Sequence, residues 1–486
     1  MVLVETSSGQ LRGEPQDVVV AFRGIPYGAP PFGPLRWRRP QPVASWSGVR
    51  DAAAFGPIAP QVIDAERLAR RGQTMSEDCL SLNVWTPAAD GAARPVVVFL
   101  HGGGVAAGAS AMPLLDGGRL AARGDLVVVT IGFRLGVLGS VYAPELLGGG
   151  TTNLSLRDQI AALRWVRAEI GAFGGDPRNV TAIGQSSGAV ALACLLTSAG
   201  GEGLFDRAVL QSGGLERVRA RRAAAGVARR IFEQLPGDPR DRSVAELLAV
   251  QATIPTGFVP PQGPFHPCVD GDLVAEHPLA AIAARPAHAM PLLIGSTRDE
   301  WRIFDTVVDT DAVTPDFLRE RARALAGDDA DPERVLAVYR ETHADPHHLA
   351  SALVTDYHFT APSEHFGRAH AARGNAVFRY ELQWPSPRPG LGAHHDTDLP
   401  LLFGTLERAP ALAGDDDAAR RMSTSVQDAW AAFARGGDPS TSAIGPWPRY
   451  DAERRPTMLL GAEPRVAEHH RAEQLAVWDG RYPAYD

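Results

Sequence analysis

The chain contains no lysine, and all 48 of its basic residues are arginine. Against 56 aspartate and glutamate residues they leave a net charge of −8, and no basic stripe dominates any part of the sequence. Proteins that bind nucleic acid through its phosphates carry a basic surface. We therefore expect no nucleic-acid partner.

Cysteine is also scarce, with only Cys79, Cys194 and Cys268 in 486 residues. The number is odd and the spacings are long, so the pattern indicates neither a disulfide framework nor a zinc-binding motif. We expect free thiols, no bound metal and a reducing compartment such as the cytoplasm.

Long apolar runs are missing as well. No stretch reaches the roughly 18 apolar residues of a membrane span. The first residues, MVLVETSS, lack the basic and apolar regions of a signal peptide. The sequence thus predicts a cytoplasmic protein with no membrane partner.

Short apolar runs do occur, and they alternate with helical stretches. This alternation favours an α/β fold with a mostly parallel central sheet and helices on both faces. The predicted strands span residues 95–100, 126–131, 179–183, 207–210 and 291–294. The predicted helices span residues 153–170 and 188–196, and another begins at Thr314-Pro315 with an N-cap and a first-turn proline. Residues 414–417 (GDDD) are interpreted as a solvated loop.

The motif Gly184-Gln185-Ser186-Ser187-Gly188 carries the first chemical signal. A predicted strand runs into it and an apolar helix leaves it, which is the context of a strained turn that projects a nucleophilic serine. The start of the helix has free amides and a positive dipole end, which favours developing negative charge. By itself the motif is also compatible with an ordinary turn.

A second motif, His101-Gly102-Gly103-Gly104, directly follows the strand at 95–100. Three glycines allow the backbone to aim several amides at one point, as an oxyanion requires. Seen alone, the same residues are compatible with a flexible loop. The two motifs together, each at a strand end, favour an acyl-transfer enzyme.

A serine hydroxyl needs a histidine base and an orienting acid, and in this type of enzyme they follow in the order serine, acid, histidine. Asp299 and Glu300 come after the strand at 291–294. His394 and His395 stand in a later loop. The order of the residues alone leaves both choices open.

Three segments resemble the type B carboxylesterase family, which includes bacterial para-nitrobenzyl esterases. They are residues 22–40 (FRGIPYGAPPFGPLRWRRP), 76–87 (SEDCLSLNVWTP) and 153–188. The resemblance extends over nearly the whole chain. It implies the α/β-hydrolase fold in a single domain over residues 1–486, with helical insertions around 215–290 and 305–370. It also implies carboxylic ester hydrolysis without a metal or cofactor.

Position by position, the resemblance implies a role for each motif residue. Ser186 matches the nucleophile, Glu300 the acid and His395 the base. The oxyanion donors are matched by the amides of Gly103, Gly104 and Ser187, and Ser212 matches a serine near the acid. Asp299 stays open as an alternative acid, and His394 as an alternative base or pocket residue.

The resemblance also implies two structural ion pairs, Arg36 with Glu77 and Arg134 with Asp158. Relatives often pair the cysteine at the position of Cys79 with one upstream, where this chain has Ala59. We therefore expect Cys79 to be a free, small, buried residue.

Two departures from the family bear on the substrate. Gln185 replaces the common glutamate before the nucleophile, which weakens any preference for cationic esters. Val105 follows the triple glycine where a large aromatic residue is common, so we expect Val105 to leave a roomy pocket. The expected substrate is a neutral, small-molecule ester with a bulky or branched group.

Other functions remain compatible with the same residues. An amidase, a carbamate hydrolase and an acyltransferase use the same machinery, and the sequence does not separate them. A binding protein on this fold is disfavoured because the serine, acid and histidine are all present. A monomer or a small homo-oligomer is expected.

Overall fold

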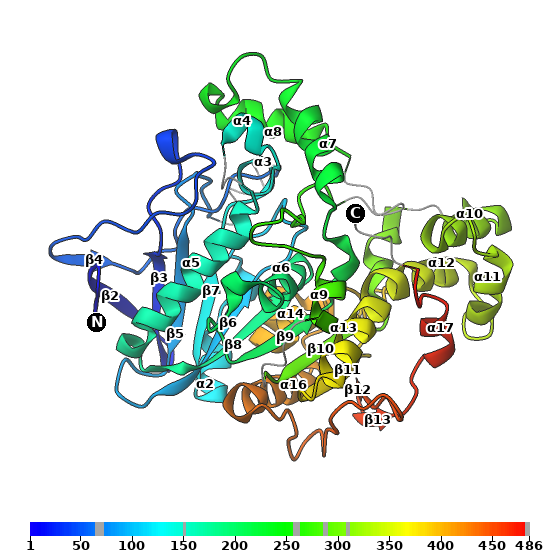
Figure 1. Cartoon of the computed structure of the whole chain (residues 1–486). Coiled ribbons are helices and arrows are strands. Elements are labelled where there is room, and N and C mark those ends of the chain that lie inside the picture. Colours follow the sequence, from blue (N-terminus) through cyan, green and yellow to red (C-terminus); the bar gives the residue numbers. More distant parts are fainter. Residues whose placement is uncertain (64–71, 149–151, 256–262, 285–289, 308–311, 482–486) are drawn as a thin grey trace.

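The computed structural model describes residues 1–63, 72–148, 152–255, 263–284, 290–307 and 312–481. A thirteen-stranded sheet forms the centre of this part of the chain (Figure 1). Its strands are β1 Val2–Thr6, β2 Gly9–Gln16, β3 Val19–Pro26, β4 Val49–Asp51, β5 Ser81–Thr86, β6 Arg94–Leu100, β7 Val127–Ile131, β8 Gly175–Gln185, β9 Arg207–Gln211, β10 Leu292–Thr297, β11 Val377–Leu382, β12 Thr457–Leu460 and β13 Arg465–Ala467.

The strand order is β1-β2-β3-β5-β7-β6-β8-β9-β10-β11-β12-β13, with β4 paired to β2. All pairs from β7 to β12 are parallel, whereas β1, β2, β3 and β5 form an antiparallel edge and β13 closes the other edge antiparallel. The predicted strands correspond to β6, β7, β8, β9 and β10. The predicted mostly parallel sheet is therefore confirmed.

Strand β6 shows why the central strands are apolar throughout. Val96, Val98 and Leu100 join one hydrophobic cluster, while Val97 and Phe99 point to the opposite face and join another. A strand covered on both faces has no position for a polar side chain, so its sequence loses the usual alternation.

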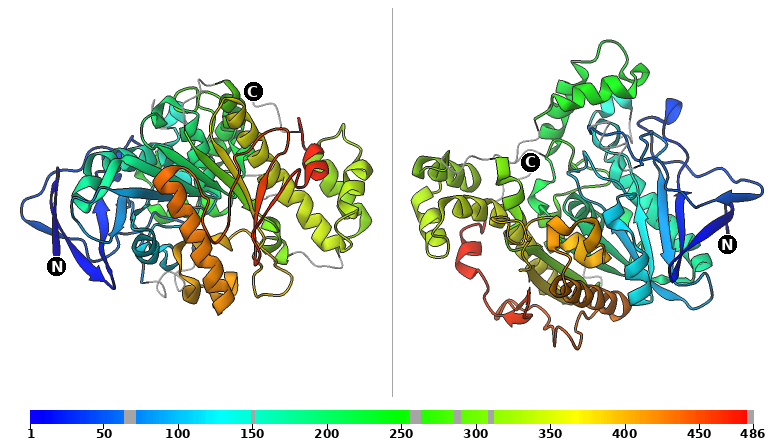
Figure 2. Two further views of the ribbon diagram at one scale, coloured as in Figure 1. Left: turned by 90° about the horizontal axis from the view of Figure 1, so that it is seen from below. Right: turned by 180° about the vertical axis from the view of Figure 1, so that it is seen from behind.

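Helices cover both faces of the sheet (Figures 1 and 2). Helices α5, α6, α9 and α13 contribute to the first cluster, and α2, α14 and α16 to the second. The α-helices of the described residues are α2 Gly118–Gly124, α3 Gly136–Gly139, α4 Pro144–Leu147, α5 Leu154–Glu169, α6 Ser187–Leu196, α7 Arg221–Phe232, α8 Val244–Ala252, α9 Pro278–Ala284, α10 Pro315–Ala326, α11 Pro332–Arg340, α12 Pro346–Thr355, α13 Ala361–Ala372, α14 Asp398–Phe403, α15 Pro410–Ala413, α16 Asp417–Gly436 and α17 Ala472–Ala476. Within the described ranges, none of them combines the length and the apolar character that crossing a membrane requires.

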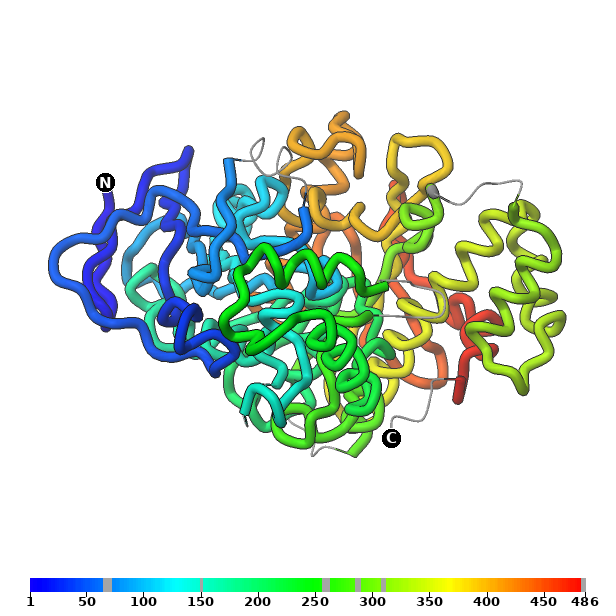
Figure 3. The backbone as a smooth tube through the Cα atoms, turned by 90° about the horizontal axis from the view of Figure 1, so that it is seen from above, coloured from blue at the N-terminus to red at the C-terminus, as the bar shows by residue number. Residues whose placement is uncertain are grey.

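Helices α10, α11 and α12 form a lobe with a separate hydrophobic cluster, which Trp478 near α17 completes. Figure 3 shows this yellow-green lobe beside the red C-terminal segment. These three helices belong to the insertion predicted around 305–370 and pack on one another rather than on the sheet. Helix α13 of the same insertion packs on the sheet through Phe366. The insertion predicted around 215–290 contains α7, α8 and α9, and parts of both insertions (256–262, 285–289 and 308–311) lie outside the described residues. The assignment of the whole chain to one domain stays a prediction.

The interpretation of residues 414–417 as a solvated loop is wrong only at Asp417, where α16 begins; Asp416 and Asp417 are both exposed. Asp416 is the N-cap of α16, where its side chain accepts a hydrogen bond from the amide of Ala419. Asp417 lies in the first turn of that helix. The end of the acidic run therefore stabilises the start of α16, because free amides and the helix dipole favour carboxylates at a helix N-terminus.

The two predicted ion pairs are confirmed. Arg134 and Asp158 contact at 2.6 Å and are almost fully buried. The Arg36–Glu77 contact, at 2.5 Å, is only slightly exposed. Arg134 also donates to the carbonyl of Arg38, so the buried pair ties the N-terminal segment to α5.

Asp158→Ala is expected to destabilise the protein by about 3–5 kcal/mol, because it leaves a buried guanidinium without its carboxylate. Urea unfolding measures the change. Asp51→Ala is the control, since it removes the partner of Arg12 at the surface and should leave the midpoint unchanged. Equal effects of the two variants would contradict a structural role for the buried pair.

Candidate active site

Ser186 lies at a sharp turn between β8 and α6. Its backbone has φ +56° and ψ −125°, a strained combination for a residue with a side chain. The amide of Ser186 donates to the carbonyl of Gln211 at 2.9 Å, at the end of the neighbouring strand β9. A strained strand-to-helix turn of this kind presents a serine hydroxyl at the edge of a sheet.

The turn requires both glycines of the motif. A Cβ on Gly188 would lie 2.1 Å from the carbonyl oxygen of Leu100, and a Cβ on Gly184 would lie 2.4 Å from the carbonyl oxygen of Gly188. Both distances are far below van der Waals contact. The glycines therefore allow α6 to pack directly against the ends of β6 and β8.

The glycine-rich loop after β6 lies beside this turn. Gly103 and Gly104 have φ +108° and +64°, and a Cβ on Gly103 would lie 2.2 Å from the carbonyl oxygen of Ala107. The amide of Val105 donates to the hydroxyl of Ser187 at 3.2 Å, which ties the loop to the start of α6. Ser187 is the first residue of α6, where the helix itself leaves the amide unused.

His395 contacts Glu300 in the interior of the protein. Its Nδ1 lies 2.5 Å from Oε2 of Glu300, and both side chains are buried. The other carboxylate oxygen of Glu300 accepts a hydrogen bond from the amide of Thr297 at 2.7 Å. The carbonyl of His395 accepts one from the side-chain amide of Gln185 at 3.1 Å. Glu300 thus holds the imidazole through Nδ1, while Gln185 holds the backbone of the same residue.

The charges around His395 raise its pKa above the ordinary value. Burial opposes a charged imidazole, but attraction by Glu300 and the hydrogen bond to it outweigh burial. A carboxylate in this position stabilises the imidazolium that forms when the ring takes a proton.

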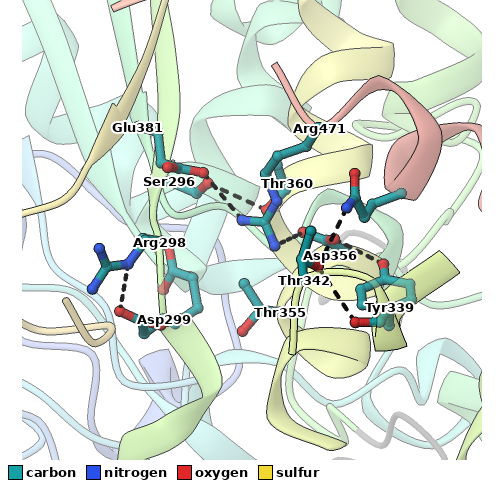
Figure 4. Close-up of polar contacts among 12 residues, drawn as sticks. Ser296, Arg298, Asp299, Tyr339, Thr342, Thr355, Asp356, Thr360, Glu381 and Arg471 are labelled. Carbon is teal, nitrogen blue, oxygen red and sulfur yellow. Dashed lines mark hydrogen bonds and ion pairs between the residues drawn. The ribbon is translucent and has the colours of Figure 1, made fainter. Parts of the chain in front are cut away.

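The two alternative residues have other surroundings. His394 is fully buried, its Nδ1 accepts a hydrogen bond from the amide of Asp396 at 3.3 Å, and burial lowers its pKa to about 4. Asp299 contacts Arg302 at 2.8 Å and Arg298 at 2.9 Å. Figure 4 shows Asp299 with Arg298. Neither residue makes a contact like that between His395 and Glu300.

A cavity of about 530 Å³ lies next to Asp299, apart from Ser186 and His395, and is lined by several charged residues. Its arginines are paired: Arg298 and Arg302 contact Asp299, and Arg471 bridges Asp356 and Glu381 at 2.9 and 3.1 Å (Figure 4). The positive charges around this cavity are therefore balanced by carboxylates of the chain.

Ser186, His395, Gly103 and Gly104 border one cavity of about 360 Å³. Gln185 borders it too. Most of the remaining lining is aromatic or small, with a few polar side chains: Ala106, Arg217, Gly263, Pro264, Phe265, His266, Phe304, Phe359 and Asp396. An adjoining cavity of about 250 Å³ shares Gly103, Gln185 and Asp396 with it.

Several residues named from the sequence do not border the catalytic cavity, among them Val105, His394 and Ser212. Val105 is buried in the main hydrophobic cluster, because its positive φ of +56° turns the chain there, and Ala106 borders the cavity instead. His394 is fully buried and is not part of the cavity lining. Ser212, at φ +52°, is held beside β10 by a 2.8 Å hydrogen bond from its amide to the carbonyl of Gly295.

Sequence reasoning missed Arg217 and the aromatic residues of the cavity. Phe304 and Phe359 pack near the ring of His395, with centroid distances of 5.4 and 4.9 Å. Phe304 follows the acid closely in the sequence, which is a usable signal. Arg217 and Phe265 belong to the 215–290 region, whose path over the sheet has no local sequence signature. Among the described residues, no group of three or more histidine, cysteine, aspartate or glutamate side chains is arranged to hold a metal ion.

Comparison with known proteins assigns a family to this arrangement. The carboxylesterase family model matches residues 2–478. The para-nitrobenzyl esterase of Bacillus subtilis (strain 168) is 35% identical over 97% of this chain and 97% of its own length. The fumonisin B1 esterase of Sphingopyxis macrogoltabida is 34% identical over 94% of this chain and 86% of its own length.

Solved structures of carboxylesterases are similar to this chain as well. A thermophilic para-nitrobenzyl esterase superposes with a TM-score of 0.88 at 33% identity, covering 98% of this chain and 99% of the other. A Geobacillus stearothermophilus carboxylesterase gives the same score, identity and coverage. These likenesses span the sheet, both motifs and the insertions. The chain therefore belongs to the carboxylesterase family of serine carboxylic ester hydrolases, and it has the α/β-hydrolase fold.

Proposed function

We propose that Ser186 is the nucleophile of this esterase, His395 its general base and Glu300 the acid that orients the base. The observation that supports this most is that Ser186, at its strained turn, and His395, which contacts the buried Glu300, border one cavity. A serine hydroxyl becomes an effective nucleophile only when such a base takes its proton.

The proposed reaction begins when Ser186 attacks the ester carbonyl and its proton passes to Nε2 of His395. The amides of Gly103, Gly104 and Ser187 donate to the developing oxyanion. The protonated His395 then gives its proton to the departing alcohol, which leaves an acyl-enzyme. Water then attacks the acyl-enzyme with His395 again as the base. This step releases the carboxylic acid product and restores Ser186. Each step uses only groups of the chain, the substrate and water.

Partition of the acyl-enzyme tests hydrolysis against acyl transfer. With p-nitrophenyl acetate and added methanol, we expect acetate to be the main product. Predominant methyl acetate would assign the same site to an acyltransferase.

The pH profile follows from the raised pKa of His395. The base works only when neutral, so kcat/KM should fall as pH falls through an inflection above the ordinary value of 6.5. In Glu300→Gln the attraction that raises this pKa is lost, so the inflection of the residual activity should move to lower pH. The profile is measured with p-nitrophenyl acetate between pH 5 and 9.

Titration of Asp398 has to be distinguished from titration of His395 in this experiment. Burial, followed by repulsion from Glu300, raises the pKa of Asp398 to about 7, so Asp398 titrates in the same range. The inflection should persist in Asp398→Asn. Loss of the inflection in Asp398→Asn, or an inflection at unchanged pH in Glu300→Gln, would contradict the assignment of this inflection to His395.

The proposed substrates are esters with no cationic group and with a bulky or branched alcohol. The uncharged Gln185 and the small lining residues Gly103, Gly104 and Ala106 support this. Ala106→Phe should fill the space and lower kcat/KM for tert-butyl acetate at least about tenfold more than for ethyl acetate. Equal losses for both esters, or no wild-type turnover of any branched acetate, would contradict a roomy pocket.

A cytoplasmic location is likewise a proposal. It is supported by three buried, unpaired cysteines and by Ala59 where relatives often carry a pairing cysteine. Fractionation of the source cells, with thiol titration of the unfolded protein giving three free thiols, tests it.

A further inference from the structure

Two buried glutamines, Gln185 and Gln211, flank the Ser186 turn. They are paired in register at the ends of the parallel strands β8 and β9, and each residue is at most 2% exposed. Gln185 directly precedes Ser186, and the amide of Ser186 donates to the Gln211 carbonyl at 2.9 Å. The sheet itself therefore fixes both glutamines relative to the proposed nucleophile.

The side chains of both glutamines reach the segment that carries His395. Nε2 of Gln185 donates to the carbonyl of His395 at 3.1 Å. Nε2 of Gln211 donates to Oδ2 of Asp398 at 2.7 Å, and Asp398 is the first residue of α14. Residues 395–398, here called the histidine loop, are thus attached at both ends to the two strands beside the nucleophile.

The surroundings of each side-chain amide determine its orientation. The indole N–H of Trp430 in α16 donates to Oε1 of Gln211 at 3.3 Å. Because an indole can only donate, Nε2 of Gln211 has to face Asp398. The partner of Gln185 is a backbone carbonyl, which can only accept, so the amide nitrogen has to face it. On the other side of this amide, a Cβ on Gly102 would lie 2.6 Å from Oε1 of Gln185, so the glycine-rich loop packs directly on this side chain.

The position of the histidine loop determines where the imidazole stands relative to the serine. Glu300, which follows β10, holds the ring through Nδ1 at 2.5 Å and accepts from the amide of His395 at 3.3 Å. The two glutamines hold the same loop from the strands next to Ser186. Proton transfer needs the reacting groups in close alignment, and a displacement of about 1 Å can cost about 100-fold in rate.

We propose that Gln185 and Gln211 are positioning residues, which set the distance between Ser186 and His395 by donating hydrogen bonds to the two ends of the histidine loop. The proposal rests on the proposed function, because it concerns the same reaction. Gln185 borders the catalytic cavity, whereas Gln211 is not part of its lining. Gln211 therefore acts on the reaction through the residues it holds and not by contact with the substrate.

Gln185→Met and Gln211→Met test the proposal, because methionine is similar in length to glutamine and has no donor. Each variant should lower kcat for p-nitrophenyl acetate by about 10- to 100-fold. KM should change by less than about threefold, because attack by the serine and attack by water use the same base and slow together. Labelling of Ser186 by an uncharged fluorophosphonate should slow as well, since it also depends on His395.

Gln427→Met is the matched control. Gln427 is a buried glutamine of α16, and its Nε2 donates to the hydroxyl of Ser423 at 2.9 Å. It is not part of the catalytic cavity lining. All three variants should unfold at a lower temperature, measured by circular dichroism, because each loses a buried hydrogen bond. The control should nevertheless keep kcat within about twofold of the wild type.

The proposal is overturned if Gln185→Met and Gln211→Met keep kcat within about twofold of the wild type, or if they change only KM. It is also overturned if only Gln185→Met is slow, because this result would assign Gln185 to substrate contact, or if Gln427→Met is equally slow. If Gln211→Met does not fold, the change in kcat against KM in Gln185→Met decides. Failure of the proposed function is different: the wild type then hydrolyses no ester and Ser186 is not labelled.

Discussion

Ser186→Ala is expected to lower kcat for ester hydrolysis by about 10⁵- to 10⁶-fold. The variant has no nucleophile, and only substrate binding and the oxyanion donors remain to assist water. Turnover of p-nitrophenyl acetate at pH 8 measures the loss. The backbone of the turn is held by the Gln211 carbonyl and by the close packing of Gly184 and Gly188, so the variant should fold normally.

Ser187→Ala is the matched control, because it removes the neighbouring hydroxyl of the same motif. Its backbone amide is retained, so the proposed oxyanion contact persists. Loss of the hydrogen bond from the Val105 amide should lower kcat by no more than about tenfold. A loss in Ser187→Ala as large as in Ser186→Ala would contradict the assignment of the nucleophile.

Two further substitutions should have nearly as large an effect. His395→Ala removes the base and should lower kcat by about 10⁵- to 10⁶-fold. Glu300→Gln keeps the shape of the acid but withdraws the charge that stabilises the imidazolium, and it should lower kcat by about 10⁴-fold. Each rate is divided by the concentration of sites that react with a fluorophosphonate or, where labelling fails, by folded protein from circular dichroism.

His394→Ala and Asp299→Asn are the matched neighbours for these two positions. His394 lies outside the cavity lining and has a pKa near 4. Asp299 is engaged by two arginines and by the amide of Ala393 at 2.9 Å. Both variants should retain activity within about tenfold of the wild type. An inactive His394→Ala together with an active His395→Ala would reverse the assignment of the base.

The parts of the site that could be predicted from the sequence are those fixed by local geometry. The Ser186 turn needs small residues two positions before and after the serine, and this requirement is visible in five letters. The glycines after β6 are visible for the same reason. The central strands were predicted because they are covered on both faces, as the two environments of β6 demonstrate.

The choice between His394 and His395 depended on family resemblance, because the two share one loop and no local rule separates them. Val105 was expected in the pocket, but a left-handed backbone at this residue turns its side chain into the core. A valine gives no hint of that conformation, since β-branched residues rarely adopt it.

Arg217 was missed for a different reason. It lies in a segment that an isolated bridge between Arg219 and Cys268 joins to residues more than forty positions away along the chain. Such long-range pairing is determined by packing and has no periodic signature. This part of the cavity lining therefore comes from the insertion rather than from the motifs.

The proposed activation of Ser186 by His395 can be tested by mass spectrometry of the intact protein and its peptides after reaction with a fluorophosphonate. We predict one adduct per chain, located on Ser186, with labelling slowed strongly in His395→Ala and unaffected in His394→Ala. An adduct on another residue, or no adduct on the folded wild-type protein, would contradict the assignment of Ser186 as the nucleophile.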